Sequence, residues 1–584
     1  MNQIYDKIKL KHDEKYNLER ALIVSLLCIL VGIVSGFGAI GFRYLIGFFH
    51  NLFFEGKISF IYNSEIPFIS RWGRFVVLVP AAGIMIANFI TEKWAPEAKG
   101  HGVPEVMVAV MEDRGKIRPI VALVKSFASA VTIGAGGSVG REGPIVQIGA
   151  SFGSTLGQVF KLKTREVIIL VSAGVAGSIG ATFNAPIGGI LFALELILPE
   201  YSIMTIMPLV VSSTIATRIS TTILGFSPAF ILPNYILVSS TEVVFYIVLG
   251  ILAGLVSILF IRTLYATEDL FNKIKINSNI KALAGGLLLG VTGYLSYRFL
   301  GQYYVFGVGY AFLNEVLSTP VPALGVLLLL VVLKIFSNSL TLASGGSGGI
   351  FAPSLFLGAA VGAAVGIIVN YAFPNITASP SAYAIVGMAA VVSGTTGASI
   401  TAIIMIFEMT RNYEIMLPLM LSVVISHFVT AFFNQETIYT KKLNRRGILI
   451  QLDKRIPILK SILVSEIMHT DLISCSPSDS ITDVLEIMHE KDLGLLPVIE
   501  NNKVKGTISY NELYHFEGEN HNKIKSLINP NRIVVSPQTT LYETLDRMIE
   551  LKTNILIVTD NNTIQGFITR NRIITSYINK RGRL

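Results

Sequence analysis

Glu142 is an acid in a setting that favours negative charge. It stands in a glycine-rich segment, residues 136–144, which ends in Gly-Arg-Glu-Gly-Pro and is followed by apolar residues. Proline is favoured in the first turn of a helix, so this segment predicts a helix that begins close to Glu142. The unpaired N–H groups and the positive dipole end of such a helix attract an anion.

This placement of Glu142 supports two interpretations. A deprotonated carboxylate can occupy the anion position itself, and a protonated one loses that attraction and swings away, which makes the side chain a gate for a passing anion. Alternatively, it is an ordinary carboxylate that stabilises the N-terminus of its own helix. Proteins seldom keep an ionisable group at membrane depth without a function, which favours the gate.

Two further segments have the same design as residues 136–144. Residues 100–104 (Gly-His-Gly-Val-Pro) and residues 345–353 also place glycines shortly before a proline. Each predicts a helix N-terminus that can attract an anion. We therefore expect three helix starts to converge on one anion site.

The same segments belong to an internal duplication. Eight residues between Gly136 and Gly153 recur 209 positions later, and four between Gly174 and Glu195 recur 213 positions later. Two homologous halves follow, at about residues 20–225 and 240–435. Interrupted segments at corresponding positions of two halves point to a transport site near the middle of a membrane. Close packing between helices, which needs small residues, is the alternative explanation of the glycines.

The elements that position these segments are expected to be membrane helices. Of 584 residues, 52% are hydrophobic and 15% are charged, which is more apolar than a soluble globular protein of this length. Several of the apolar segments are shorter than the roughly 20 residues that cross a bilayer, and many contain glycine or proline, so half-spanning, broken helices are predicted. The first segment, from Ala21 to about His50, is too long for a signal peptide and is expected to be a retained spanning helix.

The charges indicate a soluble tail. Residues 451–584 contain 32 of the 85 charged residues. The net charge of +9 does not indicate nucleic acid, because a basic cluster beside membrane lipid is expected to hold the chain on the cytoplasmic side. Cys28 and Cys475 predict no disulfide framework, which fits a reducing compartment. The basic cluster follows the last apolar segment and comprises Lys441, Lys442, Arg445 and Arg446.

The tail contains a duplication of its own, with a spacing of 60 residues. Each copy predicts a helix, two short strands and another helix. These units resemble a pair of CBS domains, expected at 461–516 and 522–578 after a linker at 441–460. The resemblance implies an adenine nucleotide between the two, although asparagine replaces the usual aspartate and brings no charge, so a structural or dimerising tail is the alternative. The corresponding residues are Ser509, Asn511, Thr569 and Asn571.

Residues 21–440 resemble the CLC family of chloride channels and chloride/proton exchangers. The resemblance rests on residues 100–104, 140–144 and 349–353 (Gly-Ile-Phe-Ala-Pro), in that order, and on Tyr439 after the last membrane helix. It implies an all-α polytopic membrane protein of two inverted repeats with short, tilted and broken helices, followed by the α+β CBS pair. It also implies a homodimer with one pore per subunit. We expect the plasma (inner) membrane, with residues 1–20 and the tail in the cytoplasm.

The resemblance assigns roles to individual residues. Glu142 is the gating glutamate, and Arg141 lies beside it at the extracellular entrance. The backbone N–H groups of Ile350 and Phe351 and the hydroxyl of Tyr439 would hold the central chloride, although Tyr439 could also be an interfacial anchor. The other residues expected at the anion site are His101, Gly102, Gly143 and Gly349.

Two positions depart from the pattern of the family. His101 stands where most members have an anion-binding serine, so its ring either donates an N–H or points away. We expect chloride rather than nitrate, and fluoride least of all, because fluoride exporters depart from the 140–144 pattern. Leu196 occupies the position of the internal proton-transfer glutamate, and leucine carries no proton. A passive channel and a proton-coupled exchanger both remain open, and Glu195, which recurs as Glu408, is expected to be structural.

Other function classes have less support in the sequence. It contains no His-Glu-x-x-His metal site and no Walker phosphate-binding motif, so we expect neither an enzyme nor a metal site nor a required cofactor. CBS pairs also accompany magnesium transporters, which makes cation transport the rival class. A cation pathway would need a cluster of acids that face the pore, whereas Glu142 is surrounded by predicted helix N-termini.

Overall fold

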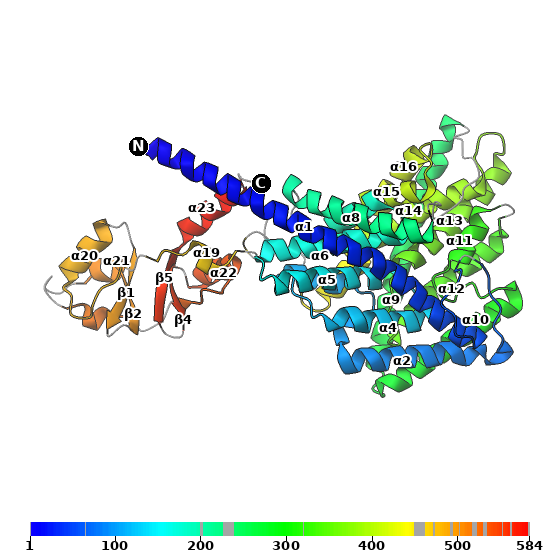
Figure 1. Cartoon of the computed structure of the whole chain (residues 1–584), viewed down its shortest axis with the longest axis horizontal. Coiled ribbons are helices and arrows are strands. Elements are labelled where there is room, and N and C mark those ends of the chain that lie inside the picture. Colours follow the sequence, from blue (N-terminus) through cyan, green and yellow to red (C-terminus); the bar gives the residue numbers. More distant parts are fainter. Residues whose placement is uncertain are drawn as a thin grey trace. The chain divides into compact units, whose positions relative to one another are not determined.

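A computed structural model of the chain separates into two compact units, residues 1–450 and 451–584. Figure 1 shows helices throughout the first unit and strands in the second, and the five strands within the described residues all belong to the second unit. Side chains are described from Leu22 onward. The described residues are 2–64, 66–198, 202–225, 239–318, 321–448, 459, 462–470, 473–490, 494–500, 503–516, 523–529, 534–551, 553–560 and 563–581.

The first half of the helical unit runs from α1 to α8. Its elements are α1 (Asn2–His50), η1 (Asn51–Glu55), η2 (Gly73–Val77), α2 (Leu78–Trp94), η3 (Pro96–Ala98), α3 (Val103–Met111), α4 (Ile120–Gly134), α5 (Glu142–Val159), α6 (Thr164–Phe183), α7 (Pro186–Phe192), η4 (Ala193–Ile197) and α8 (Ile203–Leu224).

The second half runs from η5 to α17. Its elements are η5 (Ser240–Glu242), α9 (Val243–Lys273), α10 (Ser278–Leu300), α11 (Tyr310–Leu317), α12 (Leu324–Ala343), α13 (Phe351–Ala372), α14 (Pro380–Thr396), α15 (Ser399–Thr410), α16 (Met416–Phe433) and α17 (Ile438–Asn444).

Helix length agrees with the prediction of a membrane body. Within the described residues, nine helices are long and apolar enough to cross a membrane, and the first of these spans Leu22–Glu55. Three apolar stretches, Ile120–Gly134, Pro186–Ile197 and Ser399–Thr410, have only 10–17 residues. A long first helix and short helices among full-length ones are thus confirmed.

Reciprocal contacts between the halves confirm the duplication. The N–H of Ser138 donates to Oγ1 of Thr341 at 3.2 Å, and the N–H of Ser347 donates to Oγ1 of Thr132 at the same distance. Thr132 and Ser138 correspond to Thr341 and Ser347 at the spacing of 209 residues. The second hydrogen bond therefore repeats the first, with the donor and acceptor halves exchanged. Such exchange is what a two-fold pseudo-symmetry axis between the halves produces.

Close helix packing explains the glycines inside the helices, which are distinct from the glycines that precede the prolines. A Cβ at Gly149 on α5 would lie 2.4 Å from the backbone oxygen of Gly174 on α6. The repeat has the same contact, because a Cβ at Gly358 on α13 would lie 2.2 Å from the oxygen of Gly387 on α14. Glycine at these positions lets α5 approach α6, and α13 approach α14, backbone to backbone.

The second unit has two small hydrophobic cores. Strand β1 (Leu495–Glu500) pairs antiparallel with β2 (Lys503–Ser509), and β4 (Ile555–Asp560) pairs parallel with β3 (Val534–Val535) and antiparallel with β5 (Thr563–Thr569). The order of helices and strands in each copy agrees with the prediction. The helical elements are α19 (Val464–Ile467), α20 (Ile481–Glu490), α21 (Tyr510–Tyr514), η6 (Ile524–Leu527), α22 (Leu541–Glu550) and α23 (Arg570–Arg581).

The two copies of the tail exchange short segments. Ile462 and Val464, at the start of the first copy, pack in the core that contains Leu541 and Leu556 of the second copy. Ile524, at the start of the second copy, packs in the core of the first. Each core is therefore completed by residues from the other copy.

Candidate functional site

The three glycine-rich segments meet at one place. Gly140 and Gly349 exchange two backbone hydrogen bonds of 2.7 and 2.6 Å, which joins the segments before α5 and α13. The N–H of Gly348 donates to the oxygen of Gly100 at 3.2 Å, which adds the segment before α3. The three helix N-termini expected to converge are therefore brought together by backbone contacts.

Side chains behind these segments keep them in register. The hydroxyl of Ser347 donates to the oxygen of Ala98 at 2.9 Å and lies 2.9 Å from the hydroxyl of Ser129. The amide nitrogen of Asn338 donates to the oxygen of Ser138 at 2.7 Å. Since all three of these side chains are fully buried, the loops are fixed from within the protein.

Glu142 lies at the centre of this junction. It is the first residue of α5, its side chain is 1% exposed, and the backbone N–H groups of Glu142 itself, Arg141 and Ala352 lie around its carboxylate. A Cβ at Gly140 would lie 1.9 Å from Oε2 of Glu142, and a Cβ at Gly349 would lie 2.9 Å from it. The carboxylate therefore occupies space that only glycine at these positions leaves open.

His101 is fully buried at the start of α3. Its Nε2 lies 3.5 Å from the hydroxyl oxygen of Tyr265, and that hydroxyl donates its single hydrogen to the backbone oxygen of Ile438 at 2.5 Å. Nε2 therefore supplies the hydrogen of its contact with Tyr265, and Nδ1 of the neutral ring is an acceptor. The N–H of the His101 ring is thus directed at Tyr265 and not at the expected anion position. No motif of the sequence identified Tyr265 as its partner.

The residues expected to hold the central anion lie around the same junction. Tyr439 is 1% exposed on α17 and lies within electrostatic reach of Glu142. Ile350 and Phe351 are buried at the N-terminus of α13, and the Phe351 ring packs against Phe183 with a centroid distance of 5.4 Å. Gly102, Gly143 and Gly349 are buried as well.

Lys125 is a buried cation that sequence reasoning missed. It lies on α4 with no exposed surface, and its ammonium group donates to the backbone oxygens of Ala98 and Gly100 at 2.9 and 2.7 Å. A positive charge is thereby fixed directly behind the segment that carries His101. The only signal in the sequence was a lysine within an apolar segment, which by itself does not reveal what the side chain contacts.

The basic residues after the last long helix are paired with acids of the membrane body. Lys442 and Arg446 lie 3.3 and 2.8 Å from the same oxygen of Glu105 on α3, and Arg445 pairs with Asp269 on α9. These ion pairs anchor α17 against α3 and α9. They also determine the position of Tyr439, which the same short helix carries.

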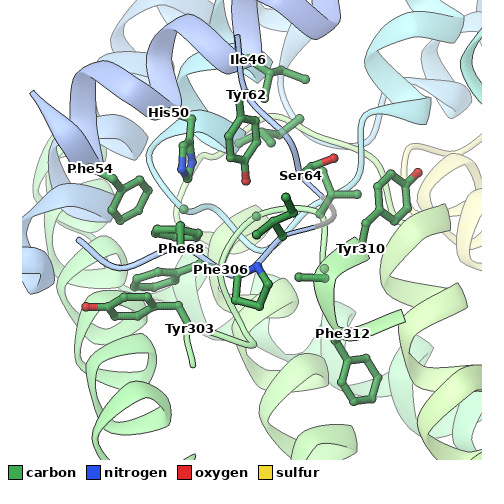
Figure 2. A pocket seen from close by; sticks show the side chains of 18 of the residues that line it. Ile46, His50, Phe54, Tyr62, Ser64, Phe68, Tyr303, Phe306, Tyr310 and Phe312 are labelled. Atoms are coloured by element: carbon green, nitrogen blue, oxygen red, sulfur yellow. The ribbon is translucent and has the colours of Figure 1, made fainter. Parts of the chain in front are cut away.

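Arg141 directly precedes Glu142 at the N-terminus of α5, and it lines a cavity. Its guanidinium lies 5.0 Å from the ring centroid of Tyr310, and its Nε has no hydrogen-bond partner among the described residues. Figure 2 shows the aromatic walls of the cavity, in which the rings of His50 and Tyr62 stack at 3.8 Å. The cavity also contains Arg43, and no acidic side chain occurs among its described lining residues. An anion approaching Glu142 from this side therefore meets positive charge.

Glu195 and Glu408 have identical structural roles in the two halves. Glu195 accepts hydrogen bonds from the N–H groups of Ile400 and Thr401 at the start of α15, at 3.0 and 2.7 Å. Glu408 accepts the equivalent bonds from Ile187 and Gly188 at the start of α7, at 3.1 and 2.7 Å. The predicted structural role of Glu195 is therefore confirmed. Leu196 follows it in η4 and is partly buried against the core.

The residues expected to contact a nucleotide begin helices of the tail. The hydroxyl of Ser509 donates to Glu512 at 2.7 Å, and the hydroxyl of Thr569 accepts from the N–H of Arg572 at 3.2 Å. Asn571 is exposed, and the side chain of Asn511 lies outside the described residues. Among the residues that the structure describes, no group of three histidine, cysteine or acidic side chains could hold a metal ion.

Comparison with known proteins matches both parts of the chain. Residues 83–431 match the family described as "Voltage gated chloride channel", and residues 464–518 and 524–579 each match the CBS domain. A "Putative chloride channel protein ClcB-like" of Ralstonia nicotianae is 33% identical over 381 residues, which cover 64% of this chain and 86% of that protein. The "H(+)/Cl(-) exchange transporter ClcA" of Vibrio cholerae is 31% identical over 429 residues, which cover 72% of this chain and 89% of that protein.

Solved structures agree with the fold. A slow cyanobacterial Cl-/H+ antiporter superposes with a TM-score of 0.64 and 25% identity, over 73% of this chain and 98% of that one. A eukaryotic CLC transporter superposes with a TM-score of 0.62 and 20% identity, over 95% of this chain and 98% of that one.

Proposed function

The chain belongs to the voltage gated chloride channel family, and on that premise we propose that it exchanges chloride for protons through a pore gated by Glu142. Members of the family are ion channels or chloride/proton exchangers, not enzymes, and the chain is accordingly a multi-pass integral membrane protein that transports chloride. Residues 140–144 and 349–353 would form the anion path at the point where α5 and α13 begin.

The burial of the Glu142 carboxylate at the glycine junction carries this proposal. A charged carboxylate that is 1% exposed is costly, unless nearby N–H groups and helix dipoles offset its charge, and the backbone N–H groups of Arg141 and Ala352 are close enough to do so. A chloride ion satisfies the same groups. Ion and carboxylate therefore compete for one position, and protonation of the carboxylate favours the ion.

Coupling to protons is the finer part of the proposal. Two similar proteins, the Vibrio cholerae transporter and the cyanobacterial antiporter, are named as chloride/proton exchangers. Leu196 supports a second candidate, a passive chloride channel, because it cannot carry a proton. Chloride is proposed as the preferred anion over nitrate, since the Vibrio cholerae transporter and the cyanobacterial antiporter are both named for chloride.

Paired flux measurements separate the two candidates. The protein is reconstituted in liposomes with a chloride gradient, and chloride and proton fluxes are recorded together. We expect chloride to drive protons against their own gradient. Chloride flux without proton movement would identify a passive channel instead.

Replacement of Glu142 tests the gate in the same assay. Glu142→Gln cannot change its charge, so chloride flux should become independent of pH and proton movement should cease. Glu242→Gln is the matched control, because Glu242 is also a fully buried acid but accepts a hydrogen bond from the N–H of Ala378 at 2.7 Å and lines neither the junction nor the cavity. A Glu142→Gln protein whose chloride flux keeps its pH dependence would contradict the gate.

We further propose a homodimer with one pore per subunit in the plasma (inner) membrane, with the N-terminal segment and the tail in the cytoplasm. Proposed domain limits are 21–440 for the membrane domain, 441–460 for the linker, and 461–516 and 522–578 for the CBS domains. Residues 449–458, 460, 461 and 522 lie outside the described part.

An adenine nucleotide is the proposed ligand of the CBS pair, since CBS domains can bind such nucleotides. Residues 451–584 form a compact unit by themselves. Isothermal titration of this fragment with ATP, ADP and AMP should therefore detect binding, and Thr569→Ala should weaken it. Absence of heat with all three nucleotides would leave the tail a structural role.

A further inference from the structure

A second recess lies at the opposite end of α4 from the aromatic cavity. It has a volume of about 560 Å³ and is lined by Ile117 and Arg118, which precede α4, whereas the aromatic cavity is lined by Ile133 and Gly136 at the other end. The 15 residues of α4 span about 22 Å at 1.5 Å per residue. The recess and the cavity thus lie on opposite sides of the glycine junction.

The recess lies on the side from which the tail leaves the membrane body. Glu105, one of its lining residues, pairs with Lys442 and Arg446 shortly before the chain enters the second unit. Protons that enter an exchanger from this side need a way to Glu142 that does not depend on Leu196.

Acidic side chains surround the recess. Glu97 pairs with Arg118 at 2.6 Å, and Glu105 has its two basic partners, while Glu112 and Asp113 are exposed. Burial raises the pKa of Asp113 above its ordinary value, so it holds a proton more readily than a free aspartate. The remaining charged groups that line the recess are Arg114 and Lys116.

Gln147 forms the inner wall of the recess. It is 1% exposed, its Nε2 donates to the backbone oxygen of Glu97 at 3.1 Å, and its Oε1 has no hydrogen-bond partner among the described residues. A buried amide oxygen of this kind has the capacity to accept a hydrogen bond from water, and the recess has room for water. The wall is therefore polar where it faces inward.

The same oxygen lies next to the glycine junction. Oε1 of Gln147 and the backbone oxygen of Gly143 lie 3.1 and 2.6 Å from the position that a Cβ at Gly102 would occupy. Gln147 also follows Glu142 by five residues on α5, a rise of about 7.5 Å along the helix axis. Water must therefore bridge the remaining distance between Oε1 of Gln147 and the carboxylate of Glu142.

We propose that this recess and Gln147 form the internal proton pathway, in place of the position taken by Leu196. A proton moves from water at Glu112 and Asp113 to water held by Oε1 of Gln147, and from there to the Glu142 carboxylate, which becomes neutral. Gln147 positions water and is not itself protonated. This inference rests on the proposed exchange function.

Flux measurements on Gln147→Leu test the pathway in the full-length protein. Leucine has nearly the same size but no hydrogen-bonding group, so proton flux should fall at least tenfold while chloride flux stays within about twofold. Gln147→Glu keeps a polar group and should retain proton flux. Gln435→Leu is the control, because Gln435 is an exposed glutamine outside the recess and the same substitution there should keep the wild-type ratio of proton to chloride flux.

The outcomes separate this inference from the exchange function. If the wild-type protein moves protons and Gln147→Leu has the same ratio of proton to chloride flux, the pathway is overturned and the exchange function stands. Wild-type protein that moves no protons would overturn both. Retained chloride flux in Gln147→Leu shows that the variant is folded.

Discussion

At the scale of single residues, the site depends on absent side chains as much as on present ones. Glu142 reaches its buried position because Gly140 and Gly349 have no Cβ. His101 directs its N–H at Tyr265, so the unusual residue of the first segment is used for internal structure. Two substitutions follow from these contacts.

Gly140→Ala should displace the Glu142 carboxylate. A methyl group there would lie 1.9 Å from Oε2, closer than any stable contact, so the acid must leave the junction. We expect chloride flux to lose most of its pH dependence, as in Glu142→Gln. Gly41→Ala is the control, since a Cβ there meets no atom within 4 Å. A Gly140→Ala protein that transports like Gly41→Ala would show that the carboxylate is not confined.

His101→Ser should strengthen chloride binding. The substitution replaces a ring acceptor with a hydroxyl donor, and a hydrogen bond to a charged group contributes about 1.5 kcal/mol or more, which corresponds to roughly tenfold in affinity. Isothermal titration of the detergent-solubilised protein with chloride, and with nitrate for comparison, measures the effect. Equal affinities for chloride in both proteins would mean that position 101 does not face the ion.

At the scale of elements, the halves stabilise each other's helix starts. Glu195 caps α15, and Glu408 caps α7, across the pseudo-symmetry axis. Helices as short as α7 have few internal hydrogen bonds, so their termini depend on such external acceptors. The duplication therefore gives the short helices partners that a single half lacks.

Glu195→Ala should destabilise the fold without abolishing coupling. The N–H groups of Ile400 and Thr401 lose their acceptor, which costs about 1–2 kcal/mol. The apparent melting temperature in detergent should fall, and the ratio of proton to chloride flux should stay unchanged. Glu92→Ala is the control, because its pair with Lys99 is exposed. An altered flux ratio in Glu195→Ala would give this acid a role in transport.

At the scale of the whole molecule, each of the two compact units contains one buried cysteine, Cys28 and Cys475. Burial raises the pKa of the Cys475 thiol to about 12. The thiolate, which is the reactive form, is therefore scarce in the folded tail at neutral pH. Thiol reactivity can thus report the unfolding of each unit separately.

The Cys28→Ser protein should react slowly with a thiol reagent at pH 8 and rapidly once the tail unfolds. Because burial favours the neutral thiol, the folded protein should remain unreactive until the pH approaches 12 or the tail opens. A denaturant series with a thiol-reactive dye measures this, and Cys475→Ser reports the membrane unit. Rapid labelling of Cys28→Ser in buffer at pH 8 would mean that Cys475 is accessible.

The sequence by itself determined the membrane class, both duplications and the glycine-rich helix starts that the structure brings together. Apolar segments, glycines before prolines and exact repeat spacings are local patterns, and a helix start at Glu142 follows from them directly. The order of strands and helices in the tail is equally local. These features were predictable because each depends on residues close together in the chain.

Only the tertiary structure decided how distant residues combine. Lys125 behind Gly100, Tyr265 beside His101 and Gln147 beside Gly102 are contacts between separate elements, and no spacing in the chain encodes them. The exchange of segments between the tail cores is of the same kind. Such contacts arise from the packing of whole helices, so the helix start at Glu142 could be predicted from the sequence, whereas its surroundings and the recess lined by Gln147 could not.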